Sequence, residues 1–290
     1  MNYTISNNRL SVTVSDMGAE LQSVCLDGTQ RLWQGDPSVW KGRSPILFPF
    51  VGRIKNGEYT YAGKAYRADL PHGFAKRSIF TLAEQTEMSL TFRLVSSEET
   101  KELYPFDFLF DVTYSIVENR LIQSFRVKNT GDQPMYYAFG GHPGFILPPD
   151  DTEFSDWYLE FAPGEELNQA LLDGVFMSEK VIPCHYAKGN KIPLYHALFD
   201  EDALILTGLK NKIFTIKSDK STHRILADCT GFDYIAFWQA TKSQAKYLCI
   251  EPWNGLPSDS KAPEDLTVKR DMRILPPDKE ENCSVSYTLE

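Results

Sequence analysis

The sequence lacks the features that mark a nucleic-acid-binding, membrane or secreted protein. It has no run rich in Lys and Arg, and its formal net charge is −9, so it has no field that attracts nucleic acid or anionic lipid. The longest uncharged run starts at Gln133 and is interrupted by glycines and prolines, which makes it unsuitable for spanning a bilayer. No basic stretch leads into an apolar one after Met1, as a secretory signal would. We therefore expect a cytoplasmic protein without nucleic-acid or membrane partners.

Cysteine and histidine are both scarce. The five cysteines form no C-x-x-C pair, and their odd number is typical of a reduced compartment rather than of a disulfide framework. The five histidines include no H-x-H or H-E-x-x-H cluster. The separate residues His72, His142 and Glu251 could form a two-histidine, one-carboxylate metal site. Because metal ligands usually come partly in short clusters, we expect no metal.

The composition is that of an ordinary globular protein. Hydrophobic residues make up 42% of the 290 residues and charged residues 24%, which excludes disordered and coiled-coil chains. No linker, repeat or low-complexity stretch divides the chain, so we expect one domain over residues 1–290.

Alternation of apolar and polar residues is the dominant pattern along the chain. In the clearest case Phe110, Val112, Tyr114 and Ile116 alternate with polar residues, and Leu121 to Lys128 continues a partner strand after a turn at Glu118. This period of two is typical of half-buried antiparallel strands. The other strands that we expect cover residues 10–15, 88–94, 203–206, 213–217, 234–238, 247–250 and 284–289.

Helical periodicity is rare by comparison. A short helix is expected over residues 96–103, where Ser97 is placed to cap it, and one more helical turn over residues 168–172. Many short strands separated by turns indicate an all-β sandwich or barrel with few short helices.

Two histidines and one glutamate occur in unusual surroundings. His142 lies in Phe139-Gly-Gly-His-Pro-Gly-Phe145, where glycines allow backbone or ligand to approach closely. His72 lies in a similar Pro-His-Gly segment. Glu251 follows the apolar strand Tyr247–Ile250, and a carboxylate there is costly unless it is paired or used. Trp253 next to it offers a flat surface on which a sugar can stack.

The remaining histidines and tryptophans have ordinary surroundings. His185, His196 and His223 are expected in surface or loop positions. The other tryptophans are expected mainly in the core; these are Trp33, Trp40, Trp157 and Trp238.

Seven segments, in order along the chain, resemble one protein family. They are Gly18-Ala-Glu-Leu21, Trp33 to Trp40, Pro45-Ile-Leu-Phe-Pro-Phe-Val-Gly-Arg53, His72-Gly-Phe-Ala75, Tyr104-Pro-Phe106, Gly140-Gly-His-Pro-Gly-Phe145 and Cys249-Ile-Glu-Pro-Trp253. The set resembles the aldose 1-epimerase, or galactose mutarotase-like, family and more closely its LacX-like branch. The resemblance implies a large antiparallel β-sandwich with an open concave face.

The resemblance also implies a reaction and the residues that carry it. An aldose 1-epimerase interconverts the α and β anomers of a sugar by acid–base ring opening and closure, without a cofactor. By this resemblance His142 is the general acid and Glu251 the general base. His72 and Arg53 would hold sugar hydroxyls or the ring oxygen, and Asp202 is our candidate for an aspartate that binds sugar hydroxyls. The implied partner is a small sugar, bound by a monomer or homodimer.

The sequence departs from the better-known mutarotases around the first histidine. Those proteins carry an Asn shortly before this histidine and Gly-Gly after it, whereas this chain has Asp69-Leu-Pro-His-Gly-Phe74. We therefore expect different contacts at that end of the sugar.

Three alternatives remain open from the sequence. A hexose-6-phosphate 1-epimerase would need a basic cluster, for which Arg43, Arg53, Lys76 and Arg77 are candidates, although we expect Lys76 and Arg77 to be solvated. A non-catalytic carbohydrate-binding β-sandwich has little need for an acid–base pair. A glycoside hydrolase normally uses two carboxylates, and Glu251 has no comparable partner motif.

Overall fold

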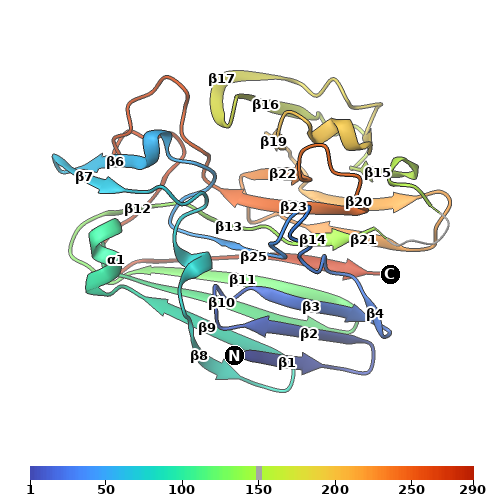
Figure 1. Cartoon of the computed structure of the whole chain (residues 1–290), viewed down its shortest axis with the longest axis horizontal. Helices are drawn as coiled ribbons and strands as arrows, with labels where there is room; N and C mark the ends of the chain where they lie inside the picture. The colour runs from blue at the N-terminus through green and yellow to red at the C-terminus, as the bar shows by residue number, and fades with distance from the viewer. Residues whose placement is uncertain (148–151) are drawn as a thin grey trace.

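Antiparallel strands are the predominant secondary structure of the computed structural model, which describes residues 1–147 and 152–290 (Figure 1). The all-β prediction is confirmed. The first strands form a four-stranded sheet whose members, in spatial order, are β1 (Asn2–Ser6), β2 (Leu10–Ser15), β3 (Leu21–Leu26) and β4 (Thr29–Gln30).

A nine-stranded sheet forms one layer of the molecule, and its central strands are long and regular. Its spatial order is β18 (Lys191–Pro193), β15 (Trp157–Glu160), β20 (Ile213–Ser218), β21 (Arg224–Asp228), β25 (Glu280–Leu289), β11 (Arg120–Asn129), β10 (Phe108–Val117), β9 (Ser89–Val95) and β8 (Thr81–Gln85).

An eight-stranded sheet forms the second layer. Its order is β17 (Phe176–Pro183), β16 (Asn168–Asp173), β19 (Leu204–Thr207), β22 (Tyr234–Trp238), β23 (Tyr247–Asn254), β13 (Phe139–Gly141) and β5 (Ile46–Leu47), and β14 (Gly144–Ile146) also pairs with β23. Two smaller ribbons pair β12 (Met135–Tyr137) with β24 (Arg273–Leu275) and β6 (Glu58–Tyr61) with β7 (Lys64–Arg67).

The main hydrophobic core lies between the two large sheets. Phe214 of β20 packs against Phe237 of β22 with ring centroids 5.1 Å apart, and Phe125 of β11 lies 5.6 Å from Phe139 of β13. Each buried side chain of this size contributes about 1.5–3 kcal/mol. The sandwich arises because alternate residues of each strand turn toward the other sheet.

The eight-stranded sheet also buries residues on its other face. On β23, Leu248 and Ile250 join the inter-sheet core, whereas Trp253 belongs to a second apolar cluster together with Ile205 and Ala236 of the neighbouring strands. Glu251 pairs with Ala236 and shares the parity of Trp253, so its side chain lies on this second face.

Of the two predicted helices, one is confirmed and the other prediction is wrong. The helix α1 (Glu98–Leu103) begins as expected, with the Ser97 side chain accepting a hydrogen bond from the Thr100 N–H at 3.2 Å. Residues 168–172 are not helical but belong to β16, because their backbone pairs with both β17 and β19. The other helical segments of the described ranges are 3₁₀ turns, η1 (Lys55–Gly57), η2 (Ala75–Arg77), η3 (Phe154–Asp156) and η4 (His196–Phe199).

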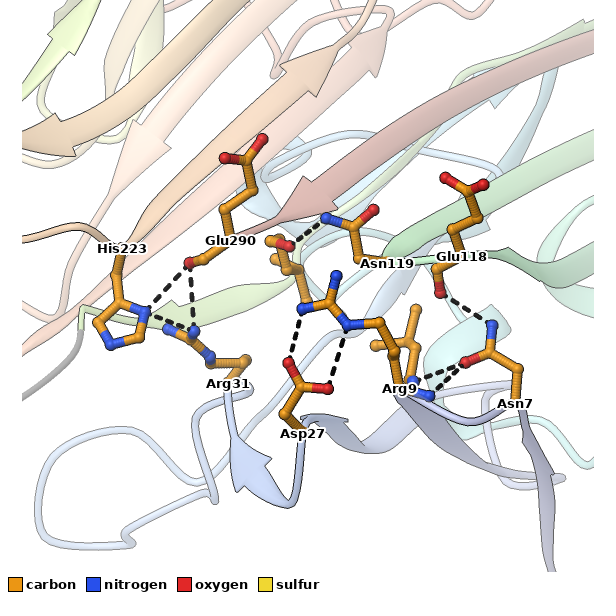
Figure 2. Close-up of polar contacts among 10 residues, drawn as sticks. Asn7, Arg9, Asp27, Arg31, Glu118, Asn119, His223 and Glu290 are labelled. Atoms are coloured by element: carbon orange, nitrogen blue, oxygen red, sulfur yellow. Dashed lines mark hydrogen bonds and ion pairs between the residues drawn. The ribbon is translucent and has the colours of Figure 1, made fainter.

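A group of polar contacts joins the four-stranded sheet to the end of β25 (Figure 2). The buried Arg31 places its Nη2 2.8 Å from His223 Nδ1 and 3.2 Å from the backbone oxygen of Glu290. Asn119, in the turn between β10 and β11, donates to the backbone oxygen of Leu289 at 2.7 Å. The Arg31 contacts hold the small sheet against the nine-stranded sheet, whereas the Asn119 contact joins two parts of the nine-stranded sheet. None of the helices in residues 1–147 and 152–290 is long and apolar enough to cross a membrane.

Candidate active site

One cavity of about 320 Å³ lies on the second face of the eight-stranded sheet, within the size range of small-molecule sites. Its lining includes all six residues that the sequence predicted for the site, namely Arg53, His72, His142, Asp202, Glu251 and Trp253. They come from five separate stretches of the described chain, because Glu251 and Trp253 share β23, and the fold brings these stretches together. Their individual roles stay predictions.

Other hollows in the described residues are larger. One of about 400 Å³ shares Asp202 with this cavity, and two further ones each contain an ion pair. Of these two, the one over β10, β11 and β25 contains Asp111 with Arg126 at 3.3 Å, and the other contains Asp259 with Arg270 at 2.6 Å. None of the three has a histidine among its lining residues. The cavity with His142 and Glu251 is therefore the better candidate for acid–base chemistry.

The strand register explains why His142 faces Glu251. β13 and β14 pair with β23 in the same register on either side of a short interruption, with Gly140 opposite Trp253 and Gly144 opposite Cys249. The interruption at His142 therefore falls opposite Glu251, and His142 Nε2 lies 3.1 Å from Glu251 Oε1. Glu251 is within β23 and not at its end, because the strand continues to Asn254, which corrects the expected boundary.

Burial sets the protonation of this pair. Both side chains are almost fully enclosed, at 8% and 2% exposure. Desolvation lowers the pKa of His142 to about 3, with a smaller contribution from the nearby Lys76. It raises the pKa of Glu251 well above its ordinary range, and the carboxyl of Asp202 adds to this rise. The favoured state is thus a neutral imidazole beside a protonated carboxyl.

Two tryptophans that we expected in the core enclose His142. The Trp40 ring stacks on the imidazole at 5.1 Å between centroids, and Trp238 meets it edge-on at 5.5 Å. Both are partly exposed and line the cavity. Trp253, our predicted stacking platform, also lines it but is only 3% exposed, so Trp40 and Trp238 present more aromatic surface to a ligand. Trp40 ends one of the segments that resemble the family, Trp33 to Trp40, whereas no signal around Trp238 distinguished it from a core residue.

His72 has a defined tautomer. The backbone N–H of Gly52 donates to its Nδ1 at 3.1 Å, so the neutral ring carries its hydrogen on Nε2. Burial and the neighbouring charges of His142, Lys76 and Arg53 lower the pKa of His72 well below its ordinary value. Its φ of +65° is unusual for a residue with a side chain. His72 is therefore fixed as a neutral hydrogen-bond donor in the cavity wall.

Asp202 also has a left-handed backbone, with φ +86°, immediately before β19. One of its carboxyl oxygens accepts a hydrogen bond from the Ala203 N–H at 2.9 Å. Burial raises the pKa of Asp202, whereas Arg53 opposes this rise. The partly buried carboxyl can accept hydrogen bonds from a ligand, as we expected of a residue that binds sugar hydroxyls.

Of the four basic residues that the sequence suggested as a phosphate-binding cluster, two line the cavity. Arg53 and Lys76 line the cavity, whereas Arg77 is exposed and Arg43 donates to Gln22 at 2.7 Å. The prediction that Lys76 is solvated is wrong, because it is partly buried and burial lowers its pKa to about 8. Lys76 was not among our predicted site residues, since a lysine in a Lys-Arg pair resembles ordinary surface charge.

One group of side chains in the described part of the chain could hold a metal ion. Its members are His142, Cys249 and Glu251, whose potential ligand atoms lie within 4.8 Å of one another. This differs from the two-histidine set considered from the sequence. Binding of a metal ion by both His142 and Glu251 would require Glu251 to lose its proton, which its burial disfavours.

Comparison with known proteins agrees with this geometry. The family model described as "Aldose 1-epimerase" matches residues 1–259. The chain belongs to the aldose 1-epimerase family. It is 30% identical over 272 residues to the chromosomal LacX protein of Lactococcus lactis subsp. lactis, and the match covers 88% of each chain. The predicted resemblance to the LacX-like branch is thereby confirmed.

Solved structures of this family have the same fold. A galactose mutarotase related enzyme from Lactobacillus acidophilus has 35% sequence identity and a TM-score of 0.92, with 100% of this chain and 97% of that chain covered. A galactose mutarotase-like protein from Lactobacillus casei ATCC 334 has 28% identity and a TM-score of 0.94, with both chains fully covered, at 100%. Family membership supports a sugar epimerase or mutarotase role for this aldose 1-epimerase family member.

Proposed function

We propose that the protein is an aldose 1-epimerase that interconverts the α and β anomers of a hexose. The observation that carries this proposal is the 3.1 Å contact between His142 and Glu251 in the wall of a cavity of sugar size. Mutarotation requires an acid and a base that reach the ring oxygen and the anomeric hydroxyl. Because both of these oxygens are attached to the same carbon, a closely spaced acid and base suit the reaction.

Ring opening uses the ionised form of the pair. One proton moving from Glu251 to His142 across their contact gives a carboxylate and an imidazolium. The carboxylate takes the proton of the anomeric hydroxyl, and the imidazolium protonates the ring oxygen. The bond between C1 and the ring oxygen breaks, its electron pair stays on the oxygen, and C1 becomes an aldehyde carbon.

Ring closure reverses these transfers after rotation about the C1–C2 bond. Opening leaves Glu251 protonated and His142 neutral, which is the state that burial favours. Glu251 then returns its proton to the aldehyde oxygen, His142 takes back the proton of the hydroxyl formed from the ring oxygen, and that oxygen bonds to C1 on the other face of the aldehyde. The cycle consumes nothing, so the proposed reaction needs no cofactor. Acid–base groups of this kind each contribute about 10²–10⁴-fold to the rate.

The surrounding residues would position the sugar. The Nε2–H of His72 and the guanidinium of Arg53 can donate to sugar oxygens, whereas Asp202 can accept from sugar hydroxyls. The partly exposed rings of Trp40 and Trp238 would stack on the apolar face of the pyranose. Asp202 also gives the cavity a second carboxyl group, so an assay must separate mutarotation from glycoside hydrolysis.

Anomer exchange measured by NMR saturation transfer tests the proposal. The protein should accelerate exchange for at least one aldose, and Glu251→Gln and His142→Asn should each slow it by about 10²–10⁴-fold because each removes one proton-transfer group. His185→Asn is the matched control, since this histidine is exposed and outside the cavity.

Other outcomes would contradict the proposal. Sugar binding without faster exchange would indicate a carbohydrate-binding protein. Release of the leaving group from an aryl glycoside, lost in Glu251→Gln, would indicate a hydrolase. Wild-type exchange rates in both site variants would show that the catalytic groups lie elsewhere.

A further inference from the structure

Two cations line the sugar cavity without a protein partner. Neither the Arg53 guanidinium nor the Lys76 ammonium makes an ion pair or side-chain hydrogen bond with residues 1–147 or 152–290. The arginines of two larger hollows differ, because Arg126 pairs with Asp111 and Arg270 with Asp259. Lys180 and Lys261 also line one of these hollows, but both are exposed. Two cavity cations without an ion-pair partner among the described residues are unusual in a chain whose net charge is −9.

Most of the charged groups that act on Lys76 have the same sign as its ammonium. Arg53, Arg77 and Lys41 act on it with the same sign, and Glu20 with the opposite sign. Glu20, however, accepts hydrogen bonds from the backbone N–H groups of Arg43 and Ser44 through one oxygen. Of the carboxyl groups of the cavity, Glu251 contributes little negative charge because burial raises its pKa well above the ordinary range, whereas for Asp202 the charge of Arg53 opposes the rise in pKa that burial causes.

The backbone holds Lys76 firmly at this position. It lies in η2 directly after the fully buried Ala75, whose N–H donates to the backbone oxygen of Phe48 at 3.2 Å. Gly18 packs so closely on Lys76 that a Cβ there would lie 2.7 Å from the Lys76 backbone oxygen. A lysine fixed on a rigid support and turned toward a cavity is suited to binding a ligand anion as a point charge.

We propose that Arg53 and Lys76 form an anion subsite in the sugar cavity, and that the substrate is an aldose with an anionic substituent remote from C1. This inference rests on the proposed function, because it assumes that the sugar ring lies between His142 and this subsite. A phosphate ester and a carboxylate are the two sources of such a charge. Either group would provide the ion-pair partner that Arg53 and Lys76 do not have within the described part of the protein.

Binding to the Glu251→Gln variant tests the subsite without turnover. Isothermal titration would compare matched sugars: glucose, glucose 6-phosphate and glucuronate, and the same three forms of galactose. At least one anionic form should bind at least about 10-fold more tightly than its neutral hexose, and the difference should shrink as salt rises. The 6-phosphates and the uronates distinguish the two sources of charge.

A second substitution, made in the Glu251→Gln variant, tests whether Lys76 causes the preference for anionic sugars. Lys76→Gln should remove most of the preference for the anionic sugar, and Lys76→Arg should retain more of it. Arg77→Gln is the matched control, because it removes the same charge from the next residue, which is exposed and outside the cavity. An equal loss in Arg77→Gln and Lys76→Gln would overturn the subsite, as would equal affinity for neutral and anionic sugars in both series.

Anomer exchange with the wild-type protein separates this inference from the proposed function. Exchange of neutral hexoses together with equal affinity for both kinds of sugar would retain the epimerase and overturn the subsite. Preferential binding of an anionic sugar without exchange of any sugar would retain the anion-binding site and contradict the epimerase, and with it the assignment of this ligand as a substrate.

Discussion

At the scale of single residues, burial makes the His142–Glu251 pair behave as one titrating unit. The two groups are 3.1 Å apart, and desolvation shifts their pKa values in opposite directions. Moving a proton between them leaves their combined proton count unchanged. The pair can therefore supply both an acid and a base without taking a proton from bulk water.

This coupling predicts a broad pH profile for kcat/KM. The pair loses its base when it gains a second proton, which occurs as pH falls toward about 3, the lowered pKa of His142. It loses its acid when Glu251 ionises, as pH rises through the raised pKa of that carboxyl. We expect no loss of anomer exchange on the acidic side between about pH 5 and 6.5. An inflection near 6.5, the ordinary pKa of histidine, would contradict the coupling.

The sequence predicted the residues of the cavity better than their contacts. His142 and Glu251 were found from glycine-rich and strand-flanking surroundings and from family motifs. Their direct contact depends on how β13 and β14 align with β23, and no local pattern encodes that register. Lys76 and Trp40 were missed as cavity residues because their neighbours in the sequence do not reveal burial in a cavity.

At the scale of elements, alternation predicted many strands, including the four-residue β19, but missed the eight-residue β17 and the shortest strands. The observed β22 has the expected boundaries, and β10 extends its expected strand by a few residues at its start. β16 was mistaken for a helical turn because Ala170-Leu-Leu172 favours helix, but pairing on both sides overrides that preference. The strands that carry the site, β13 and β14, have three residues each and are too short for periodicity.

Close packing of β13 on β23 makes Gly140 a test of this arrangement. A Cβ at this position would lie 2.4 Å from the backbone oxygen of Pro252, so Gly140→Ala must push the strands apart. We expect it to lower the free energy of unfolding by about 1–3 kcal/mol and to slow anomer exchange by displacing His142. Urea unfolding and saturation transfer measure the two effects.

A matched alanine substitution serves as the control for packing. At Gly131 a Cβ would come no closer than 3.4 Å to any neighbour, and the backbone φ is not positive. Gly131→Ala should therefore change both stability and exchange little. If Gly140→Ala were equally mild, β13 would not be held against β23 as described.

At the scale of the whole molecule, both large sheets contribute to the core, and one of them also carries the candidate site. The two sheets form the layers of the molecule (Figure 1). The core between them stabilises both layers, and the second face of the eight-stranded sheet carries the cavity. The β-sandwich and the family were predictable from the sequence, because strand alternation and motifs run along most of the chain. A single domain, a cytoplasmic location and a monomeric or homodimeric state stay predictions.

The central claim is that His142 and Glu251 exchange protons with one sugar as a unit. A double-mutant cycle of anomer-exchange rates, using His142→Asn, Glu251→Gln and the double variant, measures this most directly. We predict that the double variant is about as slow as the slower single variant, because either substitution already breaks the proton cycle. Independent effects that multiply in the double variant, or an unchanged rate in either single variant, would contradict the account.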